Sequence, residues 1–351
     1  MLKYSIKRII LAFVTAFIIL TLTFFLVKSL PGDKVRALND GQRYAFYVKQ
    51  IDLGYVFDSP IKLDEAIYGK ELDFVHFEST HTDHYFYSEP IVRQYANWIT
   101  NIFTKWDWGT STSLEVNSSA IHIIFERLPV SFSVNIISVV LSVPLGIFLG
   151  IIAGLKKNTW IDHTISTLVM IFISIPSFVV IIFLIKLLGV NAGLPTKWPT
   201  EFASADTKAL GYIIPVLSLS FGSVCGYARF VRAELCEVMS SEYLLLARTK
   251  GLTKNQAITR HALRNAFVPI LPSILAEFIG VFSGSMVLES LYGIPGIGNV
   301  YIKAINASPR DYNVLMVDMA IFTIVGLLAG IVLDLSYGFI DPRIRMGEKN
   351  S

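Results

Sequence analysis

Three carboxylates lie inside long apolar runs of this sequence, where an ionisable side chain is costly and is therefore a candidate for function. Glu277 falls in the middle of one run, and Asp318 and Asp334 fall towards the two ends of another. Such groups can relay protons, line a polar pathway, or pair with arginines. Because the three are scattered, and Asp334 could pair with Arg343 or Arg345, the pattern favours a structural or pathway-lining role over a proton relay.

The sequence lacks the short motifs that mark several well-known kinds of bond chemistry. No G-x-x-x-x-G-K-[ST] phosphate loop occurs, because the one Gly-Lys pair, Gly69-Lys70, precedes a glutamate and has no glycine five residues earlier. Neither H-E-x-x-H nor G-x-S-x-G is present. We therefore predict no catalytic residue, no bound cofactor and no metal site. If ATP energises this protein, another chain must bind the nucleotide.

Six long runs with few or no charges divide the 351 residues. A helix needs roughly 20 apolar residues to cross the hydrocarbon core of a membrane. The six runs cover 9–27, 130–155, 164–185, 209–228, 266–288 and 314–339. Only 16% of the chain is charged, whereas soluble domains average about 25%. The sequence therefore predicts an all-α polytopic membrane protein with six transmembrane helices, and it disfavours a soluble protein with buried helices.

The first run could instead be a cleaved signal peptide, because Lys3, Lys7 and Arg8 precede it. Its apolar stretch, however, is longer than the roughly 7–15 residues of a signal peptide's apolar region, and no small-x-small cleavage site follows. We therefore expect the run to be retained as a membrane span.

Basic residues concentrate in one set of connections. The segments 1–8, 156–163, 229–265 and 340–351 together hold 15 Lys and Arg in 65 residues, whereas the other connections hold 15 in 150. Because cytoplasmic loops carry the excess of Lys and Arg, the first set is predicted to lie inside. Both termini are then cytoplasmic.

Four parts follow from these spans. Residues 1–30 form the cytoplasmic N-terminus and first span, 31–129 an extracellular segment, 130–341 a five-helix core, and 342–351 a cytoplasmic tail. The extracellular segment is rich in Tyr, Phe and Trp, so we expect it to be small and partly folded, although a disordered segment is an alternative. His81 and His84 could bind a metal there, but histidines in loops are more often simply solvated.

The longest inner connection, 229–265, contains the signals of a short, well-bounded helix. The fourth helix is expected to continue out of the membrane to Met239. Ser240 and Ser241 then interrupt it and can cap the next helix. In the first turn of that helix, the charge of Glu242 suits the positive end of the helix dipole.

The end of this short helix is equally explicit. Arg248 and Lys250 suit the negative end of its dipole. Gly251, followed by the apolar Leu252, predicts a left-handed helix stop. The sequence Thr-Lys-Asn-Gln at 253–256 is a capping box that starts the next helix. A helix with such clear ends is a rigid part, which favours docking to another protein over a plain amphipathic surface helix.

Glycines and prolines within the spans indicate close packing and breaks. Glycines repeat four residues apart in several spans, which lets helices approach closely. Prolines are expected to break or kink spans, and broken helices often border a pathway. The prolines are Pro144, Pro176, Pro215, Pro269 and Pro272.

The same inner connection resembles that of bacterial permeases of the oligopeptide, dipeptide and nickel ABC importer family, in particular their B-type transmembrane subunit. The resemblance rests on motifs that follow in family order along nearly the whole chain. They are Leu30-Pro31-Gly32-Asp33, Asp107-Trp108-Gly109, Arg127-Leu128-Pro129, Ser174-Ile175-Pro176-Ser177-Phe178, Glu242-Tyr243-x-x-x-Ala247-Arg248-x-Lys250-Gly251-Leu252, Arg260-His261-Ala262-Leu263-Arg264-Asn265-Ala266, Glu289-Ser290-Leu291-Tyr292-Gly293-Ile294-Pro295-Gly296-Ile297-Gly298, Arg310-Asp311-Tyr312, Asp334-Leu335-Ser336-Tyr337 and Asp341-Pro342-Arg343-Ile344-Arg345.

This resemblance implies a type I ABC importer permease fold with an extracellular insertion after the first helix. It also implies that the inner connection forms a coupling helix that seats in a groove of an ATPase subunit. The matching residues are Glu242, Tyr243, Ala247, Arg248, Lys250, Gly251 and Leu252. Residues that could line or gate the pathway are Glu277, Pro176 and Asp318.

The implied partners are a homologous second permease, two ATP-binding subunits that use ATP and Mg, an extracellular binding protein, the membrane lipid and a peptide substrate. The function predicted in this way is half of a pathway that imports oligopeptides by alternating access. Nickel, dipeptides and glutathione travel through the same family and remain alternatives. A secondary carrier is a further alternative, as is a membrane-anchored binding or assembly protein, although a carrier should show internal repeats.

Overall fold

A computed structural model describes residues 2–30, 39–77, 81–116 and 118–340. The chain divides into two compact units. Unit 1 comprises Met1–Thr15, Leu128–Asn299 and Ile324–Ser351, and unit 2 comprises Ala16–Arg127 and Val300–Thr323. The helices α1 (Leu2–Lys28), α5 (Ala120–Leu155) and α16 (Tyr312–Ile340) each contribute residues to both units.

Four helices of the described residues are long and apolar enough to cross a membrane. They are α1, α5, α16 and the continuous stretch of α8 (Ala205–Gly211) with α9 (Ile213–Met239). Two further helix pairs pass the same test together but are sharply bent, so the number of spans is six if each pair counts as one. On that count the spans agree with the predicted six.

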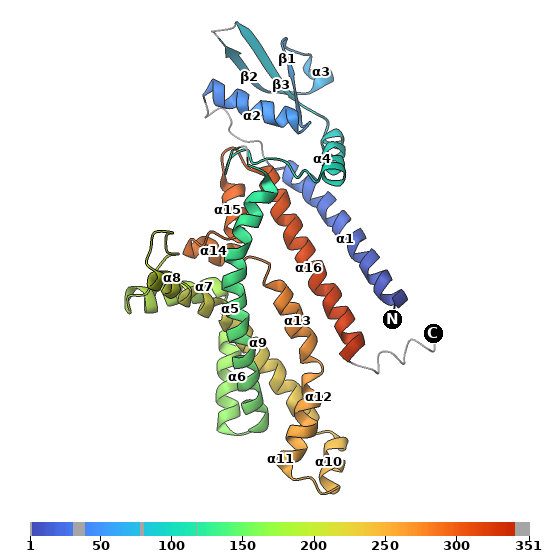
Figure 1. Ribbon diagram of the computed structural model, residues 1–351, viewed down its shortest axis with the longest axis vertical. Coiled ribbons are helices and arrows are strands. Elements are labelled where there is room, and N and C mark those ends of the chain that lie inside the picture. The colour runs from blue at the N-terminus through green and yellow to red at the C-terminus, as the bar shows by residue number, and fades with distance from the viewer. Residues whose placement is uncertain (1, 31–38, 78–80, 117, 341–351) are drawn as a thin grey trace. The chain divides into compact units, whose positions relative to one another are not determined.

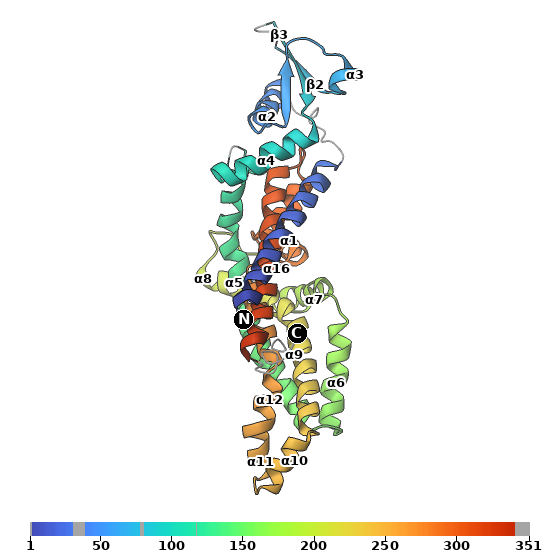
Figure 2. The ribbon, with the colours of Figure 1, turned by 90° about the vertical axis from the view of Figure 1, so that its right-hand side faces the viewer.

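The third predicted span is broken at its proline. Helix α6 (Trp160–Ile173) meets helix α7 (Ser177–Leu184), which continues as a π-helix over Ile185–Val190, at 99°. Figures 1 and 2 show the two helices running in different directions. Pro176 precedes the first residue of α7, and its ring disfavours a helical conformation at Ile175. The break expected at Pro176 is therefore confirmed.

The fifth predicted span, 266–288, is also broken. Helices α11 (Lys254–Ala257) and α12 (Leu263–Phe267), joined by a π-helix over Ile258–Ala262, meet α13 (Ile270–Gly280) at 50° next to Pro269. The chain is non-helical over 281–285 before α14 (Met286–Tyr292) begins. The span therefore ends eight residues earlier than predicted, and α15 (Ile297–Asn306) follows it. By contrast, α5 is not interrupted at Pro144.

Unit 1 is held together by the packing of α5 on α9. A Cβ on Gly150 would lie 2.6 Å from Val231 Cβ, and one on Gly146 would lie 2.6 Å from Tyr227 Cβ, so only glycine allows this approach. At α6, the fully buried Asp162 accepts hydrogen bonds of 2.5 and 2.8 Å from Arg232 of α9. These contacts join α9 to α5 and to α6.

Unit 2 contains a small sheet that the prediction of an all-helical chain did not include. Strands β1 (Val56–Ser59), β2 (Glu71–Phe77) and β3 (Thr82–Ser88) pair antiparallel in the order β1-β3-β2. Helices α2 (Asp40–Asp52), α3 (Glu65–Tyr68) and α4 (Ile91–Lys105) accompany it. Tyr47 of α2 stacks on Phe86 of β3 with ring centroids 4.3 Å apart, and both side chains are buried. The segment 40–105 therefore has its own aromatic core.

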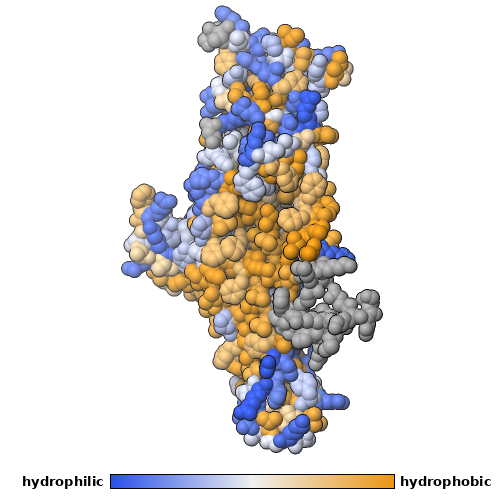
Figure 3. Space-filling model, turned by 45° about the vertical axis from the view of Figure 1, so that its right-hand side comes forward, coloured by the Kyte–Doolittle hydropathy of each residue, from blue (hydrophilic) through white to orange (hydrophobic). Residues whose placement is uncertain are grey.

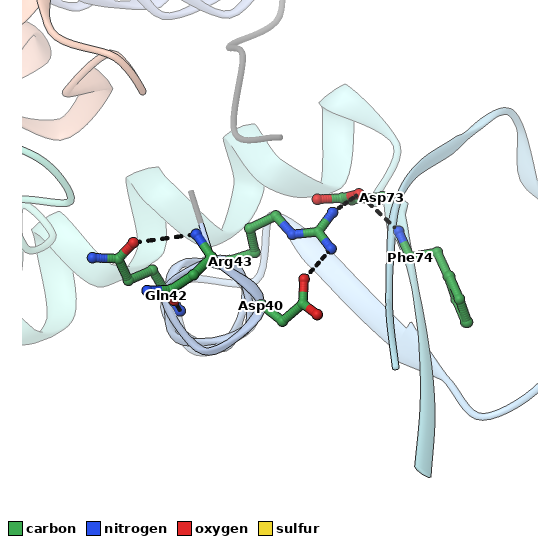
Figure 4. A network of polar contacts seen from close by, with 6 residues as sticks. Asp40, Gln42, Arg43, Asp73 and Phe74 are labelled. Carbon is green, nitrogen blue, oxygen red and sulfur yellow. Dashed lines mark hydrogen bonds and ion pairs between the residues drawn. The ribbon is translucent and has the colours of Figure 1, made fainter. Parts of the chain in front are cut away.

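Polar contacts fix this small domain. Figure 4 shows Arg43 of α2 donating to Asp73 of β2 at 2.8 Å and to Asp40 at 2.5 Å. Near the start of β3, His84 lies 2.6 Å from Asp58, so a carboxylate of the neighbouring strand β1 engages this ring. The role of the two histidines as metal ligands stays an untested alternative.

Candidate functional site

The short helix expected in the inner connection is α10 (Glu242–Thr249). Helix α9 ends at Met239, and Ser241 takes the extended conformation of an N-cap residue. Its hydroxyl, however, donates to the carbonyl of Val238 at 2.6 Å and accepts no bond from α10. The expected position of the helix is confirmed, but side-chain capping by Ser241 is wrong.

The end of α10 has the hydrogen bonds of a Schellman motif. Gly251 N donates to the carbonyl of Arg248 at 3.0 Å, and Leu252 N donates to that of Ala247 at 3.4 Å. Gly251 has φ +95, and a Cβ built there would meet no described atom within 4 Å. The left-handed stop is therefore confirmed, and glycine is required by backbone conformation and not by space.

The capping box that starts α11 is also present. Thr253 Oγ1 accepts from Gln256 N at 3.3 Å, and Gln256 Oε1 accepts from Thr253 N at 3.1 Å. Only three residues, 250–252, with non-helical geometry separate α10 from this box. Figures 1 and 2 both show α10 and α11 at the end of unit 1 where α9 and α12 terminate.

One side of α10 packs inward and the other is exposed. Leu244 is buried in a cluster with Leu235 of α9 and with Ala262 and Ala266, and Ala247 is buried as well. The exposed side chains are Glu242, Tyr243, Leu245, Leu246, Arg248, Thr249 and Lys250.

This exposed face combines charge with large apolar side chains. Leu246 is 56% and Leu245 63% exposed, and exposed apolar groups rimmed by polar ones mark interaction sites. Figure 3 shows hydrophilic residues gathered over the end of unit 1 that carries α10 and α11. The two leucines were not among the predicted site residues, because only the fold decides which positions of a short helix stay outside. Ala247, which was predicted to be a docking residue, faces inward and positions the helix.

The second candidate is a polar cavity of about 270 Å³ within unit 1. Its lining comes from α5, α9, α13 and the non-helical stretch after α13. The lining residues are Asn135, Ser138, Val139, Ser142, Leu219, Ser223, Glu277, Gly280, Val281, Ser283, Gly284 and Ser285. Seven of these twelve carry hydroxyl, amide or carboxylate groups, so the cavity is polar although its helices are apolar.

Glu277 is the charged group of this cavity. Its Oε1 accepts a hydrogen bond of 2.7 Å from the hydroxyl of Ser223 on α9, and the hydroxyl of Tyr227 also bonds to this carboxylate. Asn135 of α5 donates to the carbonyls of Val281 at 3.0 Å and of Ser283 at 2.6 Å. Ser223, Tyr227 and Asn135 lie on helices distant from Glu277 in sequence. The sequence pattern therefore predicted Glu277 as a pathway residue but not these neighbours.

The other two predicted pathway residues do not line this cavity. Pro176 sets the break between α6 and α7. Asp318 is fully buried in the part of α16 that belongs to unit 2. Asp334 pairs at 3.0 Å with Arg8 of α1, whereas Arg343 and Arg345, the expected partners, lie outside the described residues.

A buried carboxylate next to the cavity was missed. Glu289 of α14 is 4% exposed, and it accepts bonds from Ser131 Oγ at 2.8 Å, Ser285 N at 3.2 Å and Asn299 N at 3.1 Å. A Cβ on Gly296 would lie 2.5 Å from its Oε2. The Gly-Ile-Pro-Gly-Ile-Gly sequence at 293–298 therefore wraps its backbone around this carboxylate.

The comparisons with known proteins decide the family. Residues 146–346 match the model of the binding-protein-dependent transport system inner membrane component. The dipeptide transport system permease protein DppB of Bacillus subtilis (strain 168) is 30% identical over 350 residues, which cover 99% of this chain and 100% of that protein. This chain belongs to that permease family.

Other relatives of the permease are similar over their full length. The dipeptide permease DppB of Lactococcus lactis subsp. cremoris (strain MG1363) is 30% identical over 99% of this chain and 100% of its own. The oligopeptide transport system permease protein OppB of Haemophilus influenzae (strain ATCC 51907 / DSM 11121 / KW20 / Rd) is 29% identical over 98% of this chain and 100% of its own.

Family membership fits the spans and both candidate sites. The permease is a multi-pass integral membrane subunit of an ABC importer. The matched region, 146–346, contains the whole of α10 and Glu277, whereas the sheet-containing segment 40–105 lies before it. The family model thus covers the parts that carry the candidate sites.

Proposed function

We propose that this permease forms half of the translocation pathway of an ATP-driven importer of oligopeptides and works by alternating access. Support comes from similarity over the full length to permeases named for dipeptide and oligopeptide transport. The observation that carries the mechanism is the exposed, rigidly bounded α10 at the end of unit 1. A homologous second permease, two ATP-binding subunits and an extracellular binding protein complete the assembly.

In this proposal α10 is the coupling helix. Tyr243, Leu245 and Leu246 enter a groove of an ATP-binding subunit, and Glu242, Arg248 and Lys250 pair with charges on its rim. The Schellman motif and the capping box fix both ends of the connection to α11. Buried Leu244 shares a cluster with Leu235 of α9 and Ala266 of α12, which fixes α10 to those helices. A displacement of the ATP-binding subunit is therefore passed to the spans instead of being absorbed by a flexible loop.

The permease itself performs no bond chemistry in this scheme. ATP and Mg are used by the partner subunits, and the permease contributes a gated path whose contacts differ between its outward-open and inward-open states. The distribution of Lys and Arg supports a plasma-membrane orientation with both termini in the cytoplasm. That orientation places α10 on the side where ATP is available.

Peptide length is the open choice within this function. Relatives named for dipeptides and for oligopeptides are about equally similar to the chain, and nickel and glutathione remain alternatives for the substrate. Uptake of labelled peptides of graded length by the complete complex, with nickel and glutathione in parallel, separates these possibilities. Oligopeptide import predicts uptake that persists beyond dipeptides, and nickel uptake alone would overturn it.

The coupling role of α10 is tested by placing charge on its exposed apolar face. The Leu246→Asp variant is expected to reach the membrane normally, because this side chain points away from the buried cluster. It should lose most of the ATP hydrolysis that peptide-loaded binding protein stimulates, since an unpaired carboxylate would be buried in the groove. Phe202→Asp, at a residue that is 99% exposed in another loop, is the matched control. Normal stimulation in the Leu246 variant would remove α10 from the coupling path.

A further inference from the structure

The stretch after α13 is irregular backbone inside an apolar part of the sequence. Helix α13 ends at Gly280, and residues 281–285 are non-helical before α14 begins at Met286. At membrane depth such backbone is tolerated only where it is buried in protein or lines a polar cavity, because lipid cannot satisfy its polar groups. Here four of the five residues line the polar cavity.

Side chains of other helices bind the backbone of the non-helical stretch 281–285. The amide of Asn135 on α5 donates to the carbonyls of both Val281 and Ser283. The carboxylate of Glu289 accepts from the amide of Ser285. These two contacts satisfy backbone groups at each end of the non-helical stretch, so the cavity persists without a continuous helix on this side.

Glu277 places one negative charge in this cavity. It is the only ionisable residue among the described residues that line it. The hydroxyls of Ser223 and Tyr227 bond to its carboxylate and hold it in position. A charge surrounded by apolar helices attracts a cation far more strongly than the same charge in water.

The surroundings of Glu277 narrow the kind of cation. A divalent metal ion takes six or more oxygen ligands and usually more than one carboxylate, whereas this cavity offers one carboxylate and hydroxyl groups. A proton relay needs a chain of titratable groups, and Glu277 has no second one among the lining residues described. An ammonium group, which donates three hydrogen bonds, suits a carboxylate flanked by hydroxyl oxygens.

The size of the cavity indicates how much of a substrate it receives. Its volume of about 270 Å³ is below the roughly 300–1,000 Å³ of pockets that enclose drug-sized ligands. It therefore suits one end of an extended molecule. Every linear peptide with an unmodified N-terminus carries an α-ammonium group at that end, with a pKa of about 8.

Resting on the proposed function, we propose that Glu277 is a specificity-determining residue that binds the N-terminal ammonium group of the peptide during its passage. The hydroxyls of Ser223 and Tyr227 hold the carboxylate in position, and Asn135 keeps the broken end of α13 open beside it. The cavity thereby sets the direction in which a peptide lies in this half of the pathway. It also disfavours peptides whose amino terminus is blocked.

The first experiment compares two peptides in two complexes. Complete complexes in proteoliposomes, with wild-type permease or the Glu277→Gln variant, are given one labelled peptide with a free or an N-acetylated amino terminus. Because both complexes use the same binding protein, its selectivity cancels from the variant-to-wild-type ratio for each peptide. That ratio is expected to fall about tenfold for the free peptide, as for loss of one charge-assisted hydrogen bond, and to stay near one for the acetylated peptide.

Controls separate this inference from the proposed function. Glu201→Gln, at an exposed carboxylate outside the cavity, should change neither ratio. Equal ratios for both peptides in the Glu277 variant would overturn the role of Glu277, while the importer function would stand. Absence of peptide uptake by the wild-type complex would instead overturn the proposed function, and the inference with it.

A second experiment does not depend on any variant. A peptide carrying a photoreactive diazirine on its first or on its last residue is supplied to the wild-type complex, and labelled sites are mapped by mass spectrometry. The inference expects labelling of 277–285 and of the stretch around Ser223 from the first residue. Labelling of these segments from the last residue alone would overturn it.

Discussion

The short helix α10 and the cavity around Glu277 lie in the same compact unit but are specified in different ways. The hydrogen bonds at the two ends of α10 join residues within 238–256. The cavity joins Asn135, Ser223 and Glu277, which come from three helices separated by many tens of residues. The ends of α10 are therefore specified by residues close together in the sequence. The cavity forms only when the helices pack together. The two should fail in different ways when single residues are changed.

The largest effect on stability is expected at the carboxylate beside the cavity. Glu289→Ala leaves the donors of Ser131, Ser285 and Asn299 without their acceptor. Buried donors without partners are costly, so the free energy of unfolding should fall by about 3 kcal/mol. Thermal unfolding of the purified complex in detergent measures this change.

The control for this variant is Glu237→Ala, at an exposed carboxylate on α9, which should change the stability by less than about 0.5 kcal/mol. If the Glu289 and Glu237 variants were equally stable, the packing around the cavity would not depend on the contacts that Glu289 makes with residues distant in sequence.

The next effect concerns the end of α10. Gly251→Val forces a β-branched residue into a left-handed conformation, at a cost of about 1–3 kcal/mol, although there is space for its Cβ. The variant should insert into the membrane normally but lose most peptide-stimulated ATP hydrolysis and uptake, because the helix stop is lost.

Gly251→Asn is the matched comparison, since asparagine tolerates the left-handed region. It should retain much more uptake than the valine variant. Equal losses in the two variants would mean that the glycine is required for its size, for example against a partner, and not for its backbone conformation.

A smaller effect is expected at the amide that holds the broken end of α13. Asn135→Ala removes the donor to Val281 and Ser283, and the orphaned carbonyls can turn to water in the polar cavity. Peptide uptake should fall about fivefold, equivalent to about 1 kcal/mol, with membrane insertion unchanged. Uptake assays on the reconstituted complex test this, and unchanged uptake would mean that the cavity does not need this support.

The smallest effect is expected at the capping box. Thr253→Ala removes the side-chain acceptor for Gln256 N at a cost of about 1 kcal/mol. Thr249→Ala removes an exposed hydroxyl that donates to the carbonyl of Leu246 in its own helix. Stimulated ATP hydrolysis should fall two- to threefold in the first variant and stay unchanged in the second. A loss as large as that of Gly251→Val would show that the start of α11 is as critical as the end of α10.

The ends of α10 could be predicted from the sequence, whereas the cavity around Glu277 could not. The six apolar runs predicted the spans, and the Ser-Ser, Gly-Leu and Thr-x-x-Gln signals placed α10 to the residue, because helix ends depend on neighbours a few positions away. Pro176 indicated the break but not its angle of 99°. The end of the fifth span was missed, because the apolar run continues past Gly280 while Asn135, 145 residues earlier, captures the carbonyls that a helix would have used.

The sequence by itself determined the membrane class, the number of spans and the local ends of α10, because hydrophobic length and helix capping act over short distances along the chain. Only the tertiary structure decided that Glu277 faces Ser223 and Tyr227, that Asp334 pairs with Arg8, and that Glu289 is buried in a glycine-rich turn. Those outcomes depend on which helices pack together. The packing of α5 on α9 through Gly146 and Gly150 brings together side chains whose positions in the sequence are unrelated.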